Sequence, residues 1–263
     1  MRYSFHIFIL ILIIIFSACT ADEQNKTEEE TSKDNPTINS SNNENDDRDN
    51  VGSENSIKEE IDIISDDSYT VLVNKFNHLS DTYTPDDLVT VAVPTVLENP
   101  EVNQMREVAA DALADMFDAA KENGFFLFAR SGFRSYDTQV HLFNGYAEEH
   151  GEEAANTYSA KPGFSEHQTG LVMDITSESV QFQLTEHFGD TPEGEWVKEN
   201  AHYFGFIIRY PQGKENVTGY IYEPWHLRYL GKELAKMVYE SNKTYEEFLV
   251  EEEVIEHVKK EKE

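Results

Sequence analysis

The stretch that decides the fold reads Ser165-Glu166-His167-Gln168-Thr169-Gly170-Leu171-Val172-Met173-Asp174. Gly170 breaks the loop that carries His167, and residues 171–175 then read as a short buried strand that contains one acid. A carboxylate in an apolar strand costs free energy unless it is paired or bound to a metal ion. Asp174 is therefore either an ion-pair partner or a metal ligand.

A second block, Glu223-Pro224-Trp225-His226, adds another acid and another imidazole. Glu223 precedes a proline and is biased to an extended backbone, whereas Pro224 predicts a helical turn that carries His226. Two imidazoles and one carboxylate are the ligands that a catalytic zinc ion takes when its fourth position stays open for water. Taken singly, each residue fits an ordinary polar role, but the set favours a zinc site.

Three blocks of the chain belong together: Ser131-Gly132-Phe133-Arg134-Ser135 with Gln139, then Lys161 through Gly170 to Asp174, and Arg209-Tyr210-Pro211 followed by Glu223 through Tyr229. These blocks together resemble VanY-type D-alanyl-D-alanine carboxypeptidases and their L,D-carboxypeptidase relatives, the zinc peptidases that trim peptidoglycan stem peptides. The blocks occur in the order typical of that family and cover most of residues 70–240.

The resemblance implies a role for each residue of the expected site. The implied zinc ligands are His167, Asp174 and His226. Glu223 matches the general base, and Arg134 matches the group that binds the substrate and polarises it near the scissile bond. Gln139 and Ser165 match substrate contacts. Aromatic residues expected to line the cavity, or else to pack in the core, are Tyr158, Tyr210, Trp225 and Tyr229.

Local signals predict the elements that precede the site. Residues 69–73 alternate as a strand does. Residues 99–123 predict a helix, because Asn99 can cap it, Pro100 suits its first position and Gly124 closes it.

The next segment is expected to deliver Arg134 to the site. Residues 125–129 read as a buried strand, and Gly132 in the following turn leaves room for a ligand. Ser135 can cap a helix that runs to His150. Arg134 would then hold a carboxylate or carbonyl oxygen with its guanidinium fork, although a surface salt bridge is the alternative.

The remaining pattern completes an α+β domain over residues 69–263, with a small, mainly antiparallel sheet flanked by helices and one catalytic zinc ion. Further strands are expected at 206–209 and 220–222, and further helices at 193–204, 227–241 and 244–260. The other histidines lack an acidic partner at a recognisable spacing, and His202 is the first alternative ligand among them.

The N-terminal segment predicts export and anchoring. Residues 1–18 carry a basic Arg2, an apolar run and two small residues, which is a signal-peptide pattern. The following Cys19 completes a stretch that resembles a bacterial lipobox, with Phe16 where an aliphatic residue is more usual. A simple secretory signal and an uncleaved anchor are the alternatives. Residues 19–68 are acidic and poor in aromatic residues, so we expect a lipidated cysteine followed by a disordered linker.

Composition limits the possible partners. The 263 residues allow one domain with appendages, and a formal charge of −30 argues against nucleic acid, whose phosphates need Lys and Arg. The single cysteine precludes an intrachain disulfide. The expected partners are peptidoglycan stem peptides and, through the lipid on Cys19, the outer face of a bacterial membrane, where the protein would act as an extracytoplasmic monomer.

The expected function is a zinc-dependent D-alanyl-D-alanine carboxypeptidase that trims terminal D-Ala from stem peptides. One alternative is an L,D-carboxypeptidase acting on tetrapeptide stems, or an endopeptidase that uses the same site on cross-links. A second alternative is a non-catalytic, cell-wall binding lipoprotein with a structural zinc ion. Glu223 argues against the latter, because a structural zinc ion normally closes its fourth position with a ligand.

Overall fold

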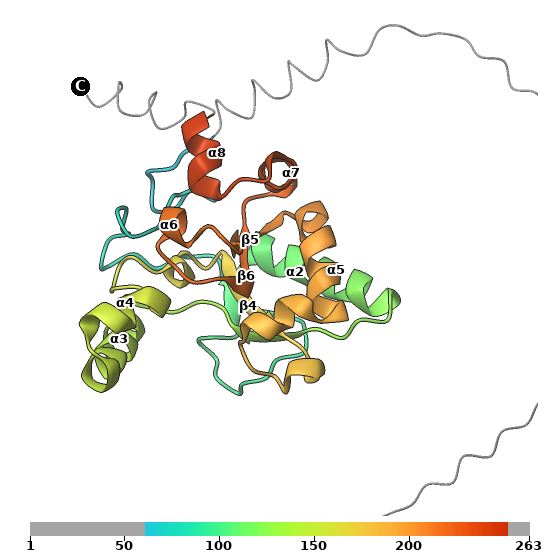
Figure 1. Ribbon diagram of the computed structural model, residues 1–263, viewed down its shortest axis with the longest axis horizontal. Helices are drawn as coiled ribbons and strands as arrows, with labels where there is room; N and C mark the ends of the chain where they lie inside the picture. The colour runs from blue at the N-terminus through green and yellow to red at the C-terminus, as the bar shows by residue number, and fades with distance from the viewer. Residues whose placement is uncertain (1–60, 252–263) are drawn as a thin grey trace, which may run out of the picture. The chain divides into compact units, whose positions relative to one another are not determined.

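A four-stranded antiparallel sheet forms the centre of the computed structural model, which describes residues 61–251 (Figure 1). Its strand order is β3-β4-β6-β5. These strands are β3 (Phe128–Ser131), β4 (Val172–Thr176), β5 (Phe206–Tyr210) and β6 (Glu223–Tyr229). A two-stranded antiparallel sheet pairs β1 (Leu88–Thr90) with β2 (Gln104–Arg106).

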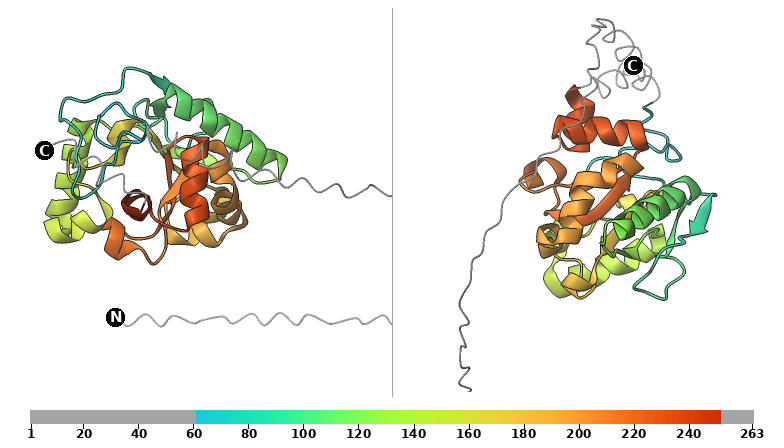
Figure 2. Two further views of the ribbon diagram at one scale, coloured as in Figure 1. Left: turned by 90° about the horizontal axis from the view of Figure 1, so that it is seen from above. Right: turned by 90° about the vertical axis from the view of Figure 1, so that its right-hand side faces the viewer.

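Helices surround the larger sheet, which confirms the predicted α+β class. The α-helices are α2 (Glu107–Glu122), α3 (Tyr136–His150), α4 (Glu152–Tyr158), α5 (Pro192–Asn200), α6 (Glu215–Thr218), α7 (Lys232–Ser241) and α8 (Tyr245–Glu251). The 3₁₀ turns are η1 (Glu166–Thr169), η2 (Glu178–Val180), η3 (Glu186–Asp190) and η4 (Ala201–Phe204). In Figures 1 and 2, α3 and α4 lie together on one side of the strands, and α2 and α5 lie on the other.

The two central strands divide their residues between a core face and a site face. Met173 and Ile175 of β4 pack in the main apolar core with Leu227 of β6 and the buried side of α2. Because successive side chains of a strand point to opposite faces, Asp174 and His226 lie on the other face. The β4–β6 register pairs these two residues directly. A shift of this strand pairing by one residue would turn Asp174 and His226 into the apolar core. The positions of the apolar residues along the two strands therefore determine which side chains face the site.

Several predicted elements differ from the structure. Residues 69–73 form no strand, because their backbone is held by Arg228, whose guanidinium donates to the carbonyls of Tyr69 and Val71. The helix expected from residue 99 begins only at Glu107, since residues 104–106 pair as β2, and the Asn99 side chain instead accepts from the Glu101 backbone N–H.

The block around Pro224 also differs from the prediction: it forms strand β6 and not a helical turn. The strand predicted at residues 220–222 does not form. The following helix accordingly begins at Lys232 and not at Leu227. Pro224 has no N–H to give to the ladder. The β5–β6 register shifts between Ile208 and Tyr210, the part of the ladder opposite this proline.

A second apolar cluster ties the start of the described chain to its end. Ile61 is buried and packs with Leu72 and with side chains of α7 and α8, and Ile63 packs against the same cluster. The packed domain therefore includes residues 61–68, which precede the predicted boundary at residue 69.

This packing predicts that a chain beginning at residue 69 is less stable than one beginning at residue 61. Loss of the buried Ile61 side chain alone should lower the free energy of unfolding by about 2 kcal/mol. Urea unfolding of both chains, with the full-length protein as the control, measures the difference. Equal midpoints for all three would show that residues 61–68 contribute nothing.

Candidate metal and catalytic site

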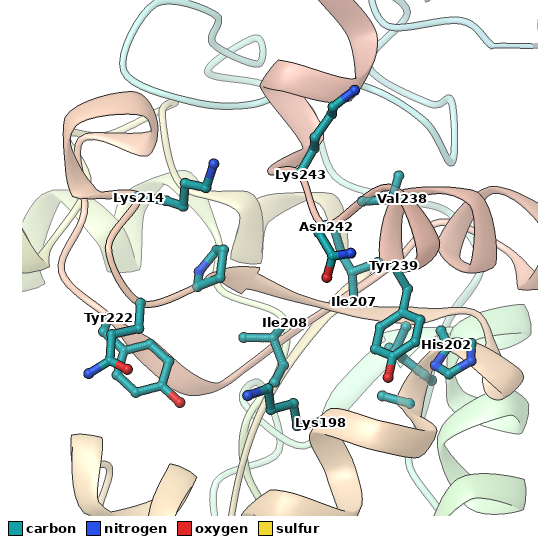
Figure 3. Close-up of a pocket in the computed structure, with 14 residues that line it drawn as sticks. Lys198, His202, Ile207, Ile208, Lys214, Tyr222, Val238, Tyr239, Asn242 and Lys243 are labelled. Atoms are coloured by element: carbon teal, nitrogen blue, oxygen red, sulfur yellow. The ribbon is translucent and has the colours of Figure 1, made fainter. Parts of the chain in front are cut away.

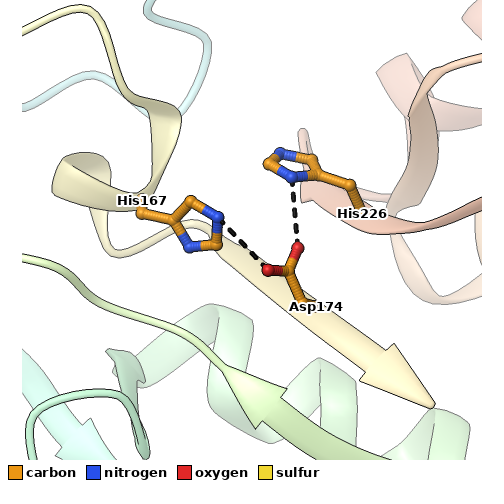
Figure 4. Close-up of side chains that lie close together, drawn as sticks. All are labelled: His167, Asp174 and His226. Carbon is orange, nitrogen blue, oxygen red and sulfur yellow. Dashed lines mark ion pairs between the residues drawn. The ribbon is translucent and has the colours of Figure 1, made fainter. Parts of the chain in front are cut away.

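His167, Asp174 and His226 converge on one point (Figure 4). They come from η1, β4 and β6, respectively, and all three are buried. One ligand atom from each lies within 4.8 Å of the others. Asp174 Oδ2 is 3.5 Å from His167 Nε2, and Asp174 Oδ1 is 3.2 Å from His226 Nδ1. The predicted trio therefore comes together as a cluster.

The cluster has the donor types of a zinc site, and its contacts of 3.5 and 3.2 Å to the two Asp174 oxygens are close to the spacing of bound ligands. Donors bound to a tetrahedral zinc ion at about 2.0–2.2 Å are themselves about 3.4 Å apart. Asp174 Oδ1 is also buried and has no hydrogen-bond partner among the described residues. Burial by itself would raise the pKa of Asp174, but the adjacent imidazoles and Arg134 outweigh it and hold that pKa below its usual range. An ionised carboxylate between two imidazoles is a competent metal ligand.

His167 is oriented by the turn that follows β3. Its Nδ1 lies 2.8 Å from the carbonyl oxygen of Gly132, so Nε2 faces the cluster. Burial and the nearby Arg134 guanidinium lower the pKa of His167 to about 3, which keeps the imidazole neutral as a metal ligand requires. Gly132 does not leave room for a ligand as predicted, since a Cβ there would lie 2.4 Å from the carbonyl oxygen of Gln104. This glycine instead allows the turn to pack against β2.

Glu223 lies beside the trio. Its Oε2 is 3.5 Å from His226 Nδ1. In a regular strand, residues three apart point to opposite faces, so the register shift opposite Pro224 explains how Glu223 and His226 share one face. Burial raises the pKa of Glu223 to about 7, with Asp174 adding to the shift and His226 opposing it. A carboxylate with such a pKa suits general base catalysis near neutral pH.

Arg134 is held in place by two neighbours. Its guanidinium donates to Gln139 Oε1 at 2.8 Å and to Ser131 Oγ at 3.2 Å. The Gln139 amide also donates to the carbonyl oxygen of Ala160 at 2.6 Å, so both ends of this side chain are engaged. Gln139 is 1% exposed and lies behind Arg134, outside the lining of the cavity.

The candidate ligands, Glu223 and Arg134 share one cavity of about 350 Å³, which Ser165 also lines. Its aromatic residues are Tyr146, Tyr158, Tyr210, Tyr220 and Trp225. The expected Tyr229 does not line it; this side chain packs in the main core. The sequence analysis missed Tyr146, although it lies seven residues after Gln139 and so on the same face of α3. Tyr220 had no comparable signal, because no regular element contains it.

His202, the alternative ligand, lies elsewhere. It lines a separate cavity of about 390 Å³ with Tyr239, on which its ring stacks at 3.8 Å (Figure 3). Tyr222 faces this second cavity, whereas its neighbours Ile221 and Glu223 line the first. The second cavity contains none of the three clustered ligands, so the structure separates His202 from the candidate metal site.

Comparisons with known proteins relate the segment that carries the candidate metal ligands to carboxypeptidases. The sequence model of the VanY family, described as D-alanyl-D-alanine carboxypeptidase, matches residues 102–232, a segment that contains the whole trio. The putative carboxypeptidase YodJ of Bacillus subtilis is 51% identical over 178 residues, which are 67% of this chain and 65% of YodJ. The chain spans less than two thirds of the length of the curated relatives it matches.

Two solved structures share the fold. The LdcB LD-carboxypeptidase is 49% identical with a TM-score of 0.68, and the match covers 70% of this chain and 86% of that one. The vancomycin-resistance D,D-pentapeptidase VanY of a VanB-type cassette, solved with Zn(II), is 32% identical with a TM-score of 0.56, over 69% of this chain and 99% of that one. Sequence identity across nearly the whole of these relatives, with the same fold, shows that the chain belongs to the VanY family of D-alanyl-D-alanine carboxypeptidases.

Proposed function

We propose that this protein is a zinc-dependent metallo-carboxypeptidase, a hydrolase that removes the terminal D-alanine from peptidoglycan stem peptides. One observation carries the proposal: a buried cluster of two imidazoles and a carboxylate lies in an open cavity with a fourth, carboxylate side chain beside it. Three protein ligands leave the fourth position of a zinc ion available, as catalytic sites require. A purely structural site gives no role to Glu223.

The proposed ligands are His167, Asp174 and His226, and a zinc ion bound there supplies Lewis-acid chemistry and makes water a stronger acid. Glu223 accepts the proton of the attacking water and returns it to the leaving amine, a sequence for which a pKa of about 7 is suited. Arg134, fixed by Gln139, presents its free N–H groups to the developing oxyanion or to the substrate carboxylate. Ser165 and Gln139 are proposed as a direct and an indirect substrate contact, respectively.

Two substrate preferences are consistent with this site. The VanY family match favours D,D-cleavage of pentapeptide stems. The higher identity and TM-score of the LdcB LD-carboxypeptidase favour L,D-cleavage of tetrapeptide stems. We propose the D,D-activity as the main function and the L,D-activity as the alternative; a terminal D-alanine leaves in both.

Mass spectrometry of defined stem peptides tests the proposal. The zinc-loaded protein is incubated separately with a pentapeptide that ends in D-Ala-D-Ala and with the tetrapeptide that lacks the last residue. Loss of one alanine from the pentapeptide alone supports the D,D-activity, and loss from the tetrapeptide supports the L,D-activity. Cleavage of neither peptide would contradict the enzyme assignment and favour a cell-wall binding protein.

Arg134 gives a prediction that separates its role from that of the metal ligands. Arg134→Lys should lower kcat/KM by affecting both binding and the chemical step, because a point charge cannot reproduce a guanidinium fork. Zinc content should stay unchanged, since Arg134 is not among the clustered ligands. Steady-state kinetics and metal analysis of the same preparation measure both. Normal kcat/KM in this variant would remove Arg134 from the proposed mechanism.

The proposed location is the outer face of a bacterial membrane, to which the protein is anchored as a monomer through lipidated Cys19. The signal peptide, Cys19 and most of the linker lie outside the described residues 61–251. Within that range, no helix is long and apolar enough to cross a membrane. The recognition of peptidoglycan by the related LdcB LD-carboxypeptidase supports an extracytoplasmic site.

Cys19→Ser should release the protein from the membrane fraction, because the substitution removes the only thiol that can carry a lipid. Catalytic activity of the released protein should be unchanged. Fractionation followed by an activity assay measures both, with the unmodified chain as the control. Unaltered membrane association would contradict the lipid anchor and favour an uncleaved apolar anchor.

A further inference from the structure

Glu166, the residue before His167, has a fully buried carboxylate that none of the roles above uses. Its Oε1 accepts two hydrogen bonds of 2.8 Å, from Nε of Arg209 and from Nη1 of Arg228. All three side chains are completely shielded from solvent. A buried charge cluster of this kind is expensive unless each member is satisfied, so its arrangement needs an explanation.

The two arginines are themselves anchored on distant segments. Arg209 forms a bidentate pair with Glu246 of α8. Arg228 donates to the backbone carbonyls of Tyr69 at 3.1 Å and Val71 at 2.8 Å. Burial would raise the pKa of Glu166, but both guanidinium groups outweigh it and hold that pKa well below its usual range. Glu166 is therefore fixed in position and ionised.

The second oxygen of this carboxylate faces the metal cluster. Glu166 Oε2 lies 3.4 Å from His226 Nε2, and among the described residues neither of these two buried atoms has a hydrogen-bond partner. The opposite ring nitrogen, Nδ1, faces Asp174 and Glu223. The ring of His226 therefore separates the candidate metal position from the Glu166 carboxylate.

The two histidines of the trio present different ring nitrogens to the cluster. His167 presents Nε2 to the cluster, and its Nδ1 is satisfied by the Gly132 carbonyl oxygen. His226 presents Nδ1, so its Nε2–H needs an acceptor on the far side. A histidine that binds a metal almost always donates its other N–H to a carboxylate or carbonyl oxygen, which fixes the tautomer and strengthens the ligand. Glu166 is the acceptor that the geometry provides.

We propose that Glu166 is a positioning residue for the metal site: its Oε2 accepts the Nε2–H of His226 and thereby holds the tautomer that offers Nδ1 to the ion. Arg209 and Arg228 occupy Oε1 and keep the carboxylate aimed at the ring. Through these contacts, α8 and the segment at 69–71 support a metal ligand that they do not touch. The inference rests on the proposed zinc site and assigns it a specific binding mode.

Zinc affinity of two matched variants of the full-length protein tests this role. Glu166→Gln keeps the shape of the side chain but removes its charge, whereas Glu246→Gln weakens the same arginine network at its far end without facing His226. Competition with a chelator of known affinity should show a loss of about 10–100-fold for Glu166→Gln. The loss for Glu246→Gln should be smaller, because the hydrogen bonds from Arg209 and Arg228 to Glu166 Oε1 remain. Equal zinc affinity in all three proteins would overturn the proposal.

A second measurement needs no substitution and so remains decisive if Glu166→Gln does not fold. Long-range ¹H–¹⁵N spectra of the zinc-loaded, unmodified protein distinguish a metal-bound ring nitrogen from a protonated one. His226 should show zinc on Nδ1 and a proton on Nε2, and His167 should show the reverse. Zinc on Nε2 of His226 would overturn the proposal. If the unmodified protein bound no zinc, the proposed function would fail first, and this outcome is distinct from zinc bound through the wrong nitrogen.

Discussion

Replacing Glu223 by glutamine should lower turnover by about 10²–10⁴-fold, the range typical of a lost general acid–base group. Glutamine keeps the volume of the side chain but cannot accept the proton of the attacking water. Because Glu223 is not one of the three clustered ligands, zinc should remain bound and the fold should be unchanged. Turnover of a stem peptide and zinc content, measured on one preparation, are the required data.

The control for this experiment is Glu195→Gln, which removes the same charge from an exposed position on α5. It should retain full turnover. Normal turnover of Glu223→Gln with zinc bound would show that Glu223 is not the base. A loss of both zinc and turnover in that variant would instead make Glu223 a ligand.

Removal of any one of the proposed ligands should abolish both zinc binding and activity. His167→Ala, Asp174→Ala and His226→Ala each leave two of three protein ligands, and the loss of affinity should exceed the roughly 10–100-fold typical of changes at residues that only support a ligand. Metal analysis after gel filtration, followed by the peptide assay, measures the two effects.

His202→Ala is the matched control for the ligand series, because it removes a buried imidazole from the separate cavity. This variant should keep one equivalent of zinc and normal activity. Zinc retained at full stoichiometry by all three ligand variants would refute the assignment. Zinc lost in His202→Ala would move the metal to the other cavity.

The sequence correctly predicted those elements whose conformation depends on interactions between residues close in the chain, such as helix caps. Ser135 caps α3 by accepting from the Thr138 backbone N–H, and Gly151 follows its last residue, as expected. The apolar strand around Asp174 also forms as predicted, since its residues are buried on both faces. The pairing of β4 with β6 then brings Asp174 opposite His226, which no local signal specifies.

The predictions failed where distant partners decide the backbone conformation. Residues 69–73 have the alternation of a strand, but Arg228, more than 150 residues later, binds their carbonyls. Pro224 suits the first turn of a helix, yet β4 and β5 on either side hold it in a strand.

Glu166 shows the same limit within the candidate site. It stands in the most informative stretch of the sequence, directly before His167. Its surroundings depend on Arg209 and Arg228, which are 43 and 62 residues away. Residue types and order in the sequence thus identified the groups expected to perform the chemistry, whereas the groups that orient them required the three-dimensional contacts.

The central claim, that one zinc ion at this cluster makes the protein a carboxypeptidase, is tested most directly by titrating the metal-free protein with zinc while D-alanine release from stem peptides is measured. The protein is first stripped with a chelator, and both the pentapeptide and the tetrapeptide are supplied. We predict no release without zinc and a linear rise to a plateau at one equivalent. Release that is independent of zinc, or no release from either peptide with zinc bound, would contradict the account.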